Sequence, residues 1–211
     1  DKTIRFFSEN CFIPITVGGG IENLYHVESI LKNGAEKISI NTSAILNPNL
    51  INEISRNFGS QSLILSIDCK ISKNNNYSIV SHSGSMIHDL NLLDWIKECE
   101  ERGAGEFIFT SVDREGTKKG YDMRLLSKVH ESTSRPIIIS GGVGNFYDFV
   151  EPLNNYNVSA VCASNIFFHN EHSVHIAKSI INKKNFINRI DNTYIYNNFS
   201  NYNFWIFNNY E

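Results

Sequence analysis

The stretch PITVGGGIENLYHVESILKNGAEKISINTS, residues 14–43, decides the fold, because it recurs as PIIISGGVGNFYDFVEPLNNYNVSAVCASN, residues 136–165. The two segments align without a gap, and the identical pairs include Pro14/Pro136, Gly19/Gly141, Gly20/Gly142, Asn23/Asn145 and Tyr25/Tyr147. Each copy has the pattern of a strand, a glycine turn, a helix and a second strand. Two βα units that recur four units later are half of an eightfold barrel, whereas an open doubly wound sheet has no reason to repeat in this way.

Short apolar runs alternate with helical patterns between and around the two copies. The predicted strands are residues 14–17, 37–40, 62–67, 106–110, 136–139 and 158–162. The predicted helices include residues 23–33, 49–58, 92–102, 123–131 and 146–153, and residues 1–11 have the pattern of a helix with no strand before it. Residues 77–81 alternate and indicate a short excursion in the loop after the third strand. Six consecutive βα units predict a parallel sheet with right-handed crossovers.

The predicted fold is therefore a (β/α)8 barrel truncated at its N-terminus to about six βα units. We expect residues 1–190 to form this barrel without its first βαβ segment, because eight strands are needed for closure. Residues 191–211 are rich in asparagine and aromatic residues without a clear period, and we interpret them as a tail.

Composition favours an ordinary enzyme of the cytoplasm. Apolar residues make up 41% of the chain, charged residues 19%, and the formal net charge is −3. This balance gives no basic footprint for nucleic acid, no apolar run has the length of a membrane span, and no signal peptide opens the chain. The four cysteines are widely spaced with no CxxC pair, so we expect reduced, structural thiols.

The glycine runs at the strand ends predict two anion cradles, since working residues of a barrel lie at the C-terminal ends of its strands. The first comprises Gly19, Gly20, Asn41 and Thr42; the second comprises Ser140, Gly141, Gly142, Ala163 and Ser164. Backbone N–H groups of a glycine loop next to a helix N-terminus suit a phosphate. Two such sites at one barrel mouth imply a ligand with a phosphate at each end. The alternative is that the glycines only permit tight turns.

Asp68 ends the run LILSIDCK and is expected to point into the barrel mouth between the two cradles. A carboxylate beside a dry interior can have a raised pKa and act as general acid and base. The alternative is an Asp that caps the next helix or binds Lys70.

The loop DREGTKKGYD follows the strand at residues 106–110. Thr110 and Asp113 are predicted to line the substrate pocket, and Gly116 and Thr117 to add donors to a phosphate. Asp113 could equally hold its own loop through Asx-type hydrogen bonds.

The histidines support no metal or cofactor, and we predict neither. His169, His172 and His175 are spaced by three and could share a helix face, but exposed polar positions explain them at least as well. His82 and His88 lie in the loop after Asp68 and could touch substrate.

Five motifs together carry a family resemblance: TVGGGI, EKISINTSA, NFGSQSLILSIDCK, GAGEFIFTSVDREGTKKGYD and IIISGGVG. Over most of the barrel region they resemble the cyclase subunit of imidazole glycerol phosphate synthase, a ribulose-phosphate-binding TIM barrel. The sister isomerase of histidine synthesis shares the half-barrel repeat, but the SIDCK strand and the GYD ending fit the cyclase better.

The resemblance implies a lyase reaction of histidine biosynthesis. Ammonia from a separate glutaminase (glutamine amidotransferase) subunit passes through the barrel and attacks a bis-phosphorylated ribulosyl-formimino substrate, giving imidazole glycerol phosphate and an aminoimidazole carboxamide ribotide. Asp68 matches one of two catalytic aspartates, the one on the family's fifth strand. Lys37 and Glu106 match the charged ring at the end of the barrel where ammonia enters.

Two departures from the family leave alternatives open. This sequence holds no counterpart of the strand-one aspartate, so an inactive barrel fragment is one alternative. These residues alone are not expected to catalyse the reaction. The loop has Glu115 in DREGT where the histidine enzyme usually has DRDGT. That residue, with FGSQS and IDCK, resembles a paralogue that supplies ammonia for sugar amidination in surface-polysaccharide synthesis, also with a glutaminase partner.

Overall fold

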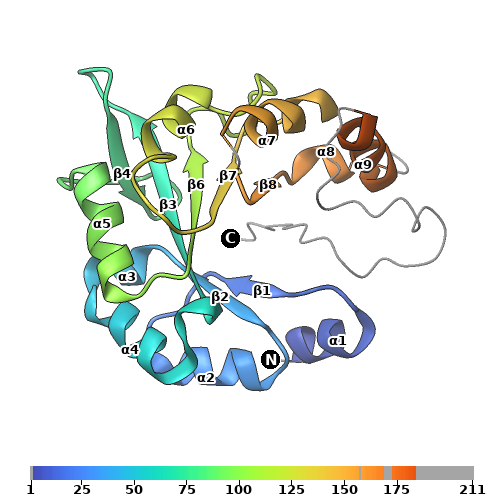
Figure 1. Cartoon of the computed structure of the whole chain (residues 1–211). Helices are drawn as coiled ribbons and strands as arrows, with labels where there is room; N and C mark the ends of the chain where they lie inside the picture. The colour runs from blue at the N-terminus through green and yellow to red at the C-terminus, as the bar shows by residue number, and fades with distance from the viewer. Residues whose placement is uncertain (1, 157, 169–172, 184–211) are drawn as a thin grey trace.

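A curled sheet forms the centre of the protein in the computed structural model, which describes residues 2–156, 158–168 and 173–183 (Figure 1). Six strands follow one another along it, namely β1 (Thr16–Gly18), β2 (Lys37–Ile40), β3 (Leu63–Ile71), β6 (Glu106–Ser111), β7 (Ile137–Ser140) and β8 (Ala160–Cys162). Every neighbouring pair on this path is parallel. The predicted run of parallel βα units and the truncated barrel are thus confirmed.

Helices cover the convex side of the sheet in Figure 1. They are α1 (Lys2–Asn10), α2 (Leu24–Lys32), α3 (Thr42–Leu46), α4 (Asn49–Phe58), α5 (Leu92–Arg102), α6 (Met123–Val129), α7 (Val150–Tyr156), α8 (Asn165–Phe168) and α9 (Ser173–Lys183), with 3-10 turns η1 (Ser60–Ser62) and η2 (Phe146–Phe149). None of the helices in the described part of the chain is long and apolar enough to cross a membrane.

Alternation along the strands divides the core into two layers, because successive side chains of a strand point to opposite faces. On β3, Leu63 and Leu65 belong to the large cluster packed under the helices. Ile64 lies on the other face and joins Ile108, Ile138 and Cys162 in a small apolar cluster inside the curl. The parallel strands are therefore buried on both faces over the middle of their length, as their nearly continuous apolar sequences predict.

The internal repeat has a structural counterpart in helix starts. Asn23 caps α2, with its side chain accepting from the backbone N–H of His26 at 3.0 Å. Its repeat partner Asn145 accepts from the N–H of Tyr147 at 2.9 Å and forms a capping box with Asp148. The same residue thus begins a helix after each glycine loop, which explains why both copies keep it.

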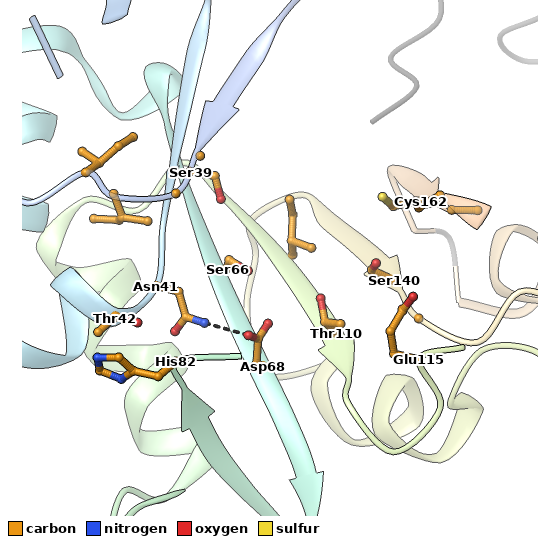
Figure 2. A pocket seen from close by; sticks show the side chains of 18 of the residues that line it. Ser39, Asn41, Thr42, Ser66, Asp68, His82, Thr110, Glu115, Ser140 and Cys162 are labelled. Carbon is orange, nitrogen blue, oxygen red and sulfur yellow. Dashed lines mark hydrogen bonds between the residues drawn. The ribbon is translucent and has the colours of Figure 1, made fainter. Parts of the chain in front are cut away.

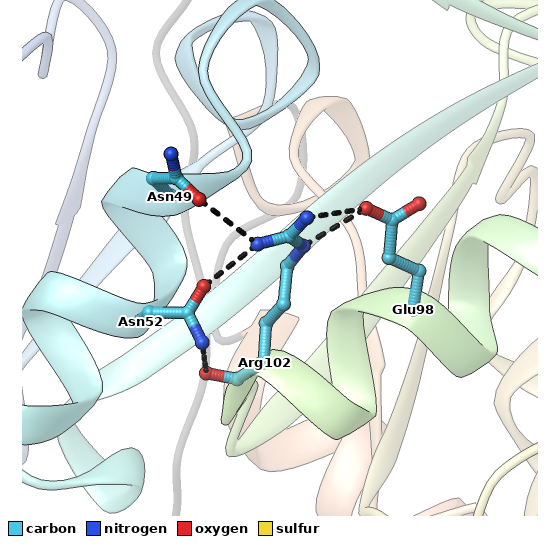
Figure 3. Close-up of polar contacts among 4 residues, drawn as sticks. All are labelled: Asn49, Asn52, Glu98 and Arg102. Carbon is cyan, nitrogen blue, oxygen red and sulfur yellow. Dashed lines mark hydrogen bonds and ion pairs between the residues drawn. The ribbon is translucent and has the colours of Figure 1, made fainter.

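A polar cluster joins α4 to α5 (Figure 3). The Arg102 guanidinium donates from Nε to Glu98 at 2.9 Å, and from Nη1 to the side-chain oxygens of Asn52 at 2.8 Å and Asn49 at 3.2 Å. Asn52 Nδ2 in turn donates to the Arg102 carbonyl at 3.2 Å. The helix ends there because Gly103 follows in the left-handed conformation, with φ 108°.

Several boundaries differ from the sequence prediction for reasons of long-range pairing. Strand β3 continues to Ile71 beyond the predicted end at residue 67, because β4 (Tyr77–Ser81) pairs antiparallel with it. The excursion is a hairpin with a further strand, β5 (Met86–His88), which places His88 on a strand and His82 in the turn. The predicted helix at residues 146–153 begins as the 3-10 turn η2 before it becomes α7.

Some predictions fall outside the described residues. They are the domain boundary at residue 190, the tail at residues 191–211, and His169 and His172. Among the residues that are described, no group of three or more His, Cys, Asp or Glu side chains is placed to hold a metal ion.

Candidate active site

A cavity of about 1220 Å³ lies at the carboxyl ends of the six parallel strands, and each strand contributes to its wall. Most of the predicted site residues line it, namely Gly19, Gly20, Asn41, Thr42, Asp68, Thr110, Gly116, Ser140, Gly141, Gly142, Ala163 and Ser164. Figure 2 shows the side chains of this wall from β2 to β8. The two predicted cradles and Asp68 therefore share one space, as a ligand with two phosphates requires.

Asp68 lies half-buried on β3 in the middle of this wall. Asn41 Nδ2 donates to its Oδ2 at 3.0 Å (Figure 2). Burial raises the pKa of the Asp68 carboxyl from 3.8 to about 6, and hydrogen bonds from the Asn41 and Thr110 side chains lower that pKa in part. Burial has the largest effect on this pKa, and it raises the pKa because it disfavours the charged form. Neither alternative interpretation of Asp68 is needed, since its observed side-chain partners are Asn41 and Thr110 rather than a helix end or Lys70.

The register of the sheet places four polar or thiol side chains in one row across four strands. Asp68 pairs with Thr110, Thr110 with Ser140, and Ser140 with Cys162. Burial raises the pKa of the Cys162 thiol to about 12, so this sulfur is neutral at physiological pH. Through this row, the cavity floor carries hydrogen-bonding groups from Asp68 toward the second cradle.

The first cradle follows β1 and β2. Gly19 and Gly20 have φ of 92° and 67°, a backbone conformation that side chains rarely adopt, and a Cβ on either would meet nothing within 4 Å. A side chain at Gly19 or Gly20 would therefore collide with no other part of the described chain, so packing does not explain why these positions are glycine. Thr42 begins α3, and Asn41 before it makes no capping bond with its side chain. The open glycine backbone is what close approach of an anion requires.

The second cradle follows β7 and β8 and is more tightly packed. A Cβ on Gly142 would lie 2.4 Å from the Gly120 carbonyl oxygen, and the Gly120 N–H donates to the Gly142 carbonyl at 2.8 Å. Gly141 has φ of 94°. The turn-forming alternative thus holds in part for the glycines of both cradles, since all four have positive φ. At Gly142 the missing side chain also lets the β6–α6 loop approach, and the residue lines the cavity as well.

The remaining predicted residues are Thr110 on β6 and three residues of the β6–α6 loop, and only some of them reach the cavity. Thr110 and Gly116 line the cavity, but Asp113 and Thr117 are not among its lining residues. Asp113 Oδ2 accepts from the Ile71 N–H at 2.6 Å, and Thr117 Oγ1 donates to the Arg114 carbonyl at 2.7 Å. In this structure Asp113 joins the loop to the end of β3, and Thr117 closes a turn within the loop.

Lys37 and Glu106 form an ion pair at the opposite end of the strands. They are the first residues of β2 and β6, and their side chains are 21% and 19% exposed. The pair bridges β3, which lies between the two strands. In the sheet register Ile64 is paired with Glu106, and Ile108, two residues further along β6, lines the cavity.

Sequence reasoning missed further residues of the cavity wall, including Ser39, Ser66, Glu115, Lys118 and Cys162. Strand period gives the signal for three of them. Ser66 stands two residues before Asp68 on β3, so the two share a face. Ser39 and Cys162 stand on β2 and β8, two residues before the predicted Asn41 and Ser164, which follow the ends of those strands. Glu115 and Lys118 come from the β6–α6 loop, where no period applies.

A curled parallel sheet with two matched glycine loops at its strand ends places the protein in the βα-barrel class. Comparison with known proteins agrees. The family model described as "Histidine biosynthesis protein" (His_biosynth) matches residues 1–173. The chain belongs to this family.

Three relatives bear the name imidazole glycerol phosphate synthase subunit HisF. The protein of Flavobacterium psychrophilum is 44% identical over 80% of this chain and 66% of its own length. That of Chloroherpeton thalassium is 41% identical over 84% and 70%, and that of Staphylococcus carnosus is 40% identical over 82% and 68%. The chain thus spans about two thirds of the length of these relatives.

Proposed function

We propose that this protein is the cyclase subunit of an imidazole glycerol phosphate synthase, a lyase of histidine biosynthesis. Its substrate is a ribulosyl-formimino compound with a phosphate at each end, and its second reactant is ammonia. The observation that carries the proposal is Asp68, a carboxyl with a pKa of about 6 in the same cavity as two glycine cradles. Membership of the family, and the name that the three relatives share, support the same reaction.

The residues of the cavity divide the work between binding and proton transfer. Backbone N–H groups around Gly20 and Thr42 hold one phosphate, and those around Gly142 and Ser164 hold the other. Asp68 then faces the middle of the extended substrate. Because its pKa is near neutrality, both protonated and ionised forms are accessible, as a group that gives and takes protons requires. Asn41 and Thr110 fix the orientation of the carboxylate.

Ammonia enters, in this proposal, past Lys37 and Glu106 from a glutaminase subunit bound at that end of the sheet. Ile64, Ile108 and Ile138 belong to an apolar layer inside the curl, in which Ile64 is paired with Glu106 and Ile108 lines the cavity. Such a layer favours neutral ammonia over ammonium, because a bare charge in an apolar interior is strongly disfavoured. The proposal includes a cytoplasmic location, with which the four free cysteines agree.

The comparisons favour the histidine-pathway cyclase over sugar amidination and over an inactive fragment. The relatives described above carry the cyclase name, whereas only Glu115 and two short motifs suggested the paralogue.

Turnover by the complete natural reading frame tests the proposal. The protein, supplied with ammonium salt and the bis-phosphorylated substrate, is expected to release imidazole glycerol phosphate without a glutaminase. With glutamine in place of ammonium, product should appear only when a glutaminase subunit is added. A folded protein that gives no product with ammonium would contradict the proposal.

A further inference from the structure

Three polar side chains form a chain of hydrogen bonds from the cavity into the β4–β5 hairpin. Ser81 Oγ lies 2.9 Å from His82 Nδ1 and 2.7 Å from His88 Nε2. Ser81 is fully buried, and His88 is half-buried on β5. His82 is exposed and lines the cavity. The chain therefore connects a cavity-lining ring to a second ring through one buried hydroxyl.

The hairpin turn holds His82 in an unusual backbone conformation. His82 and Ser83 have φ of 50° and 55°, in the left-handed region that residues other than glycine rarely occupy. The Ser85 hydroxyl and N–H both donate to the His82 carbonyl, at 2.8 and 3.2 Å. Such a conformation persists only where surrounding contacts enforce it, and it is commonly found at binding sites.

His82 lies on the side of the cavity that carries the first cradle. Figure 2 shows its ring near Asn41 and Thr42, and β4 is paired with β3 so that Val80 stands opposite Asp68. Because Nδ1 contacts Ser81, Nε2 is the ring nitrogen left for a ligand. The other charged side chains of this wall are Asp68 from β3, Glu22 beyond β1, and Glu115 and Lys118 from the β6–α6 loop.

We propose that His82 Nε2–H donates a hydrogen bond to an anionic oxygen of the phosphate in the first cradle, with Ser81 and His88 as positioning residues. The inference rests on the proposed function for the identity of the ligand as a phosphate ester. Ser81 has one hydroxyl proton, so it donates to one ring and accepts from the other. An anion selects the direction in which His88 Nε2–H donates to Ser81, Ser81 donates to His82 Nδ1, and His82 Nε2–H donates to the anion.

Nitrogen-15 NMR of the histidine rings tests the direction of this chain. With saturating inorganic phosphate at slightly alkaline pH, His82 should show a protonated Nε2 and an unprotonated Nδ1. Ser81→Ala should weaken this tautomer preference, because Nδ1 loses its hydroxyl donor, while Ser78→Ala on the same strand should leave it unchanged. A His82 ring with an unprotonated Nε2 in the phosphate complex would overturn the proposal.

Phosphate affinity tests the contact itself, and the second cradle supplies an internal control. His82→Asn keeps a residue that tolerates the left-handed backbone but shortens the side chain. Phosphate affinity reported by the N–H signals of Gly20 and Thr42 should fall about fivefold, as for one lost hydrogen bond. Affinity reported by Gly142 and Ser164 should not change. Unchanged affinity at the first cradle in folded His82→Asn would contradict the proposal.

Kinetics separate this inference from the proposed function. In the turnover assay, His82→Asn should raise the KM for the bis-phosphorylated substrate several-fold with little change in kcat, because a phosphate contact persists from ground state to transition state. The NMR measurements need no turnover. A protein that holds phosphate through His82 but gives no product would support the inference and contradict the cyclase function.

Discussion

At the scale of single residues, the raised pKa of the Asp68 carboxyl makes stability depend on pH. Burial lifts its pKa from 3.8 to about 6, so the folded protein keeps a proton that the unfolded chain has released. The stabilisation associated with that proton is complete below the unfolded pKa and is lost as pH rises through about 6.

The free energy of unfolding should therefore contain a pH-dependent part that belongs to Asp68. We expect wild type to lose roughly 2 kcal/mol relative to Asp68→Asn between about pH 4 and pH 6.5, because one pKa unit corresponds to about 1.4 kcal/mol. Urea unfolding of both proteins across this range measures it. Parallel stability curves for the two proteins would show that the carboxyl has an ordinary pKa.

The two glycine cradles predict different costs for the same substitution. A Cβ on Gly20 meets open space, whereas one on Gly142 meets the Gly120 carbonyl oxygen at 2.4 Å. Gly20→Ala should lower stability by about 1 kcal/mol for its left-handed backbone alone, and Gly142→Ala by roughly 3 kcal/mol or more. Thermal unfolding compares them directly. Equal losses would indicate that the loop near Gly120 moves freely.

At the scale of elements, the contact between α4 and α5 depends on Arg102. Its side chain is 27% exposed, and the guanidinium joins Glu98 on its own helix to Asn49 and Asn52 on the neighbouring one. Within the described part of the chain, the ion pair of Lys97 is an exposed one with Glu101, at 4.0 Å.

Arg102→Met should consequently lower the free energy of unfolding by about 1–2 kcal/mol, since two amide oxygens lose a charged donor. Lys97→Met, a matched removal of a cation from the same helix, should cost less than about 0.5 kcal/mol. Urea denaturation gives both values. A loss for Lys97→Met as large as that for Arg102→Met would mean that helix charge, and not the interhelical cluster, is responsible.

The sequence predicted the elements whose signal lies within a short stretch of residues. It missed those that form only by pairing with another strand. The strands at residues 37–40 and 106–110 are apolar runs that any buried parallel sheet requires, and the structure has both. Strand β5 and the extension of β3 to Ile71 exist because β4 pairs with its neighbours, and no short window of sequence contains that pairing. Sequence could name His82 as a residue that could touch substrate but could not fix its place in the cavity wall, because that place depends on the hairpin turn.

At the scale of the molecule, the cavity joins the two halves of an internal repeat. One half contributes Gly20 and Thr42, the other Gly142 and Ser164, and Asp68 lies on β3, one of the two strands between them. Strand ends and the repeat were sufficient to predict this arrangement. The side-chain partners were not predictable, because Asp113 bonds to Ile71 and Asn41 bonds to Asp68 across separate strands.

The turnover number of Asp68→Asn tests the cyclase proposal most directly. It is measured with ammonium salt and the bis-phosphorylated substrate, beside Asp94→Asn, which removes an exposed carboxylate from the first turn of α5. We expect kcat to fall at least about 100-fold in Asp68→Asn, the usual effect of losing a general acid–base group, and to stay within about twofold of wild type in Asp94→Asn. A kcat for folded Asp68→Asn close to that of wild type would contradict the role of Asp68 and, with it, the proposed mechanism.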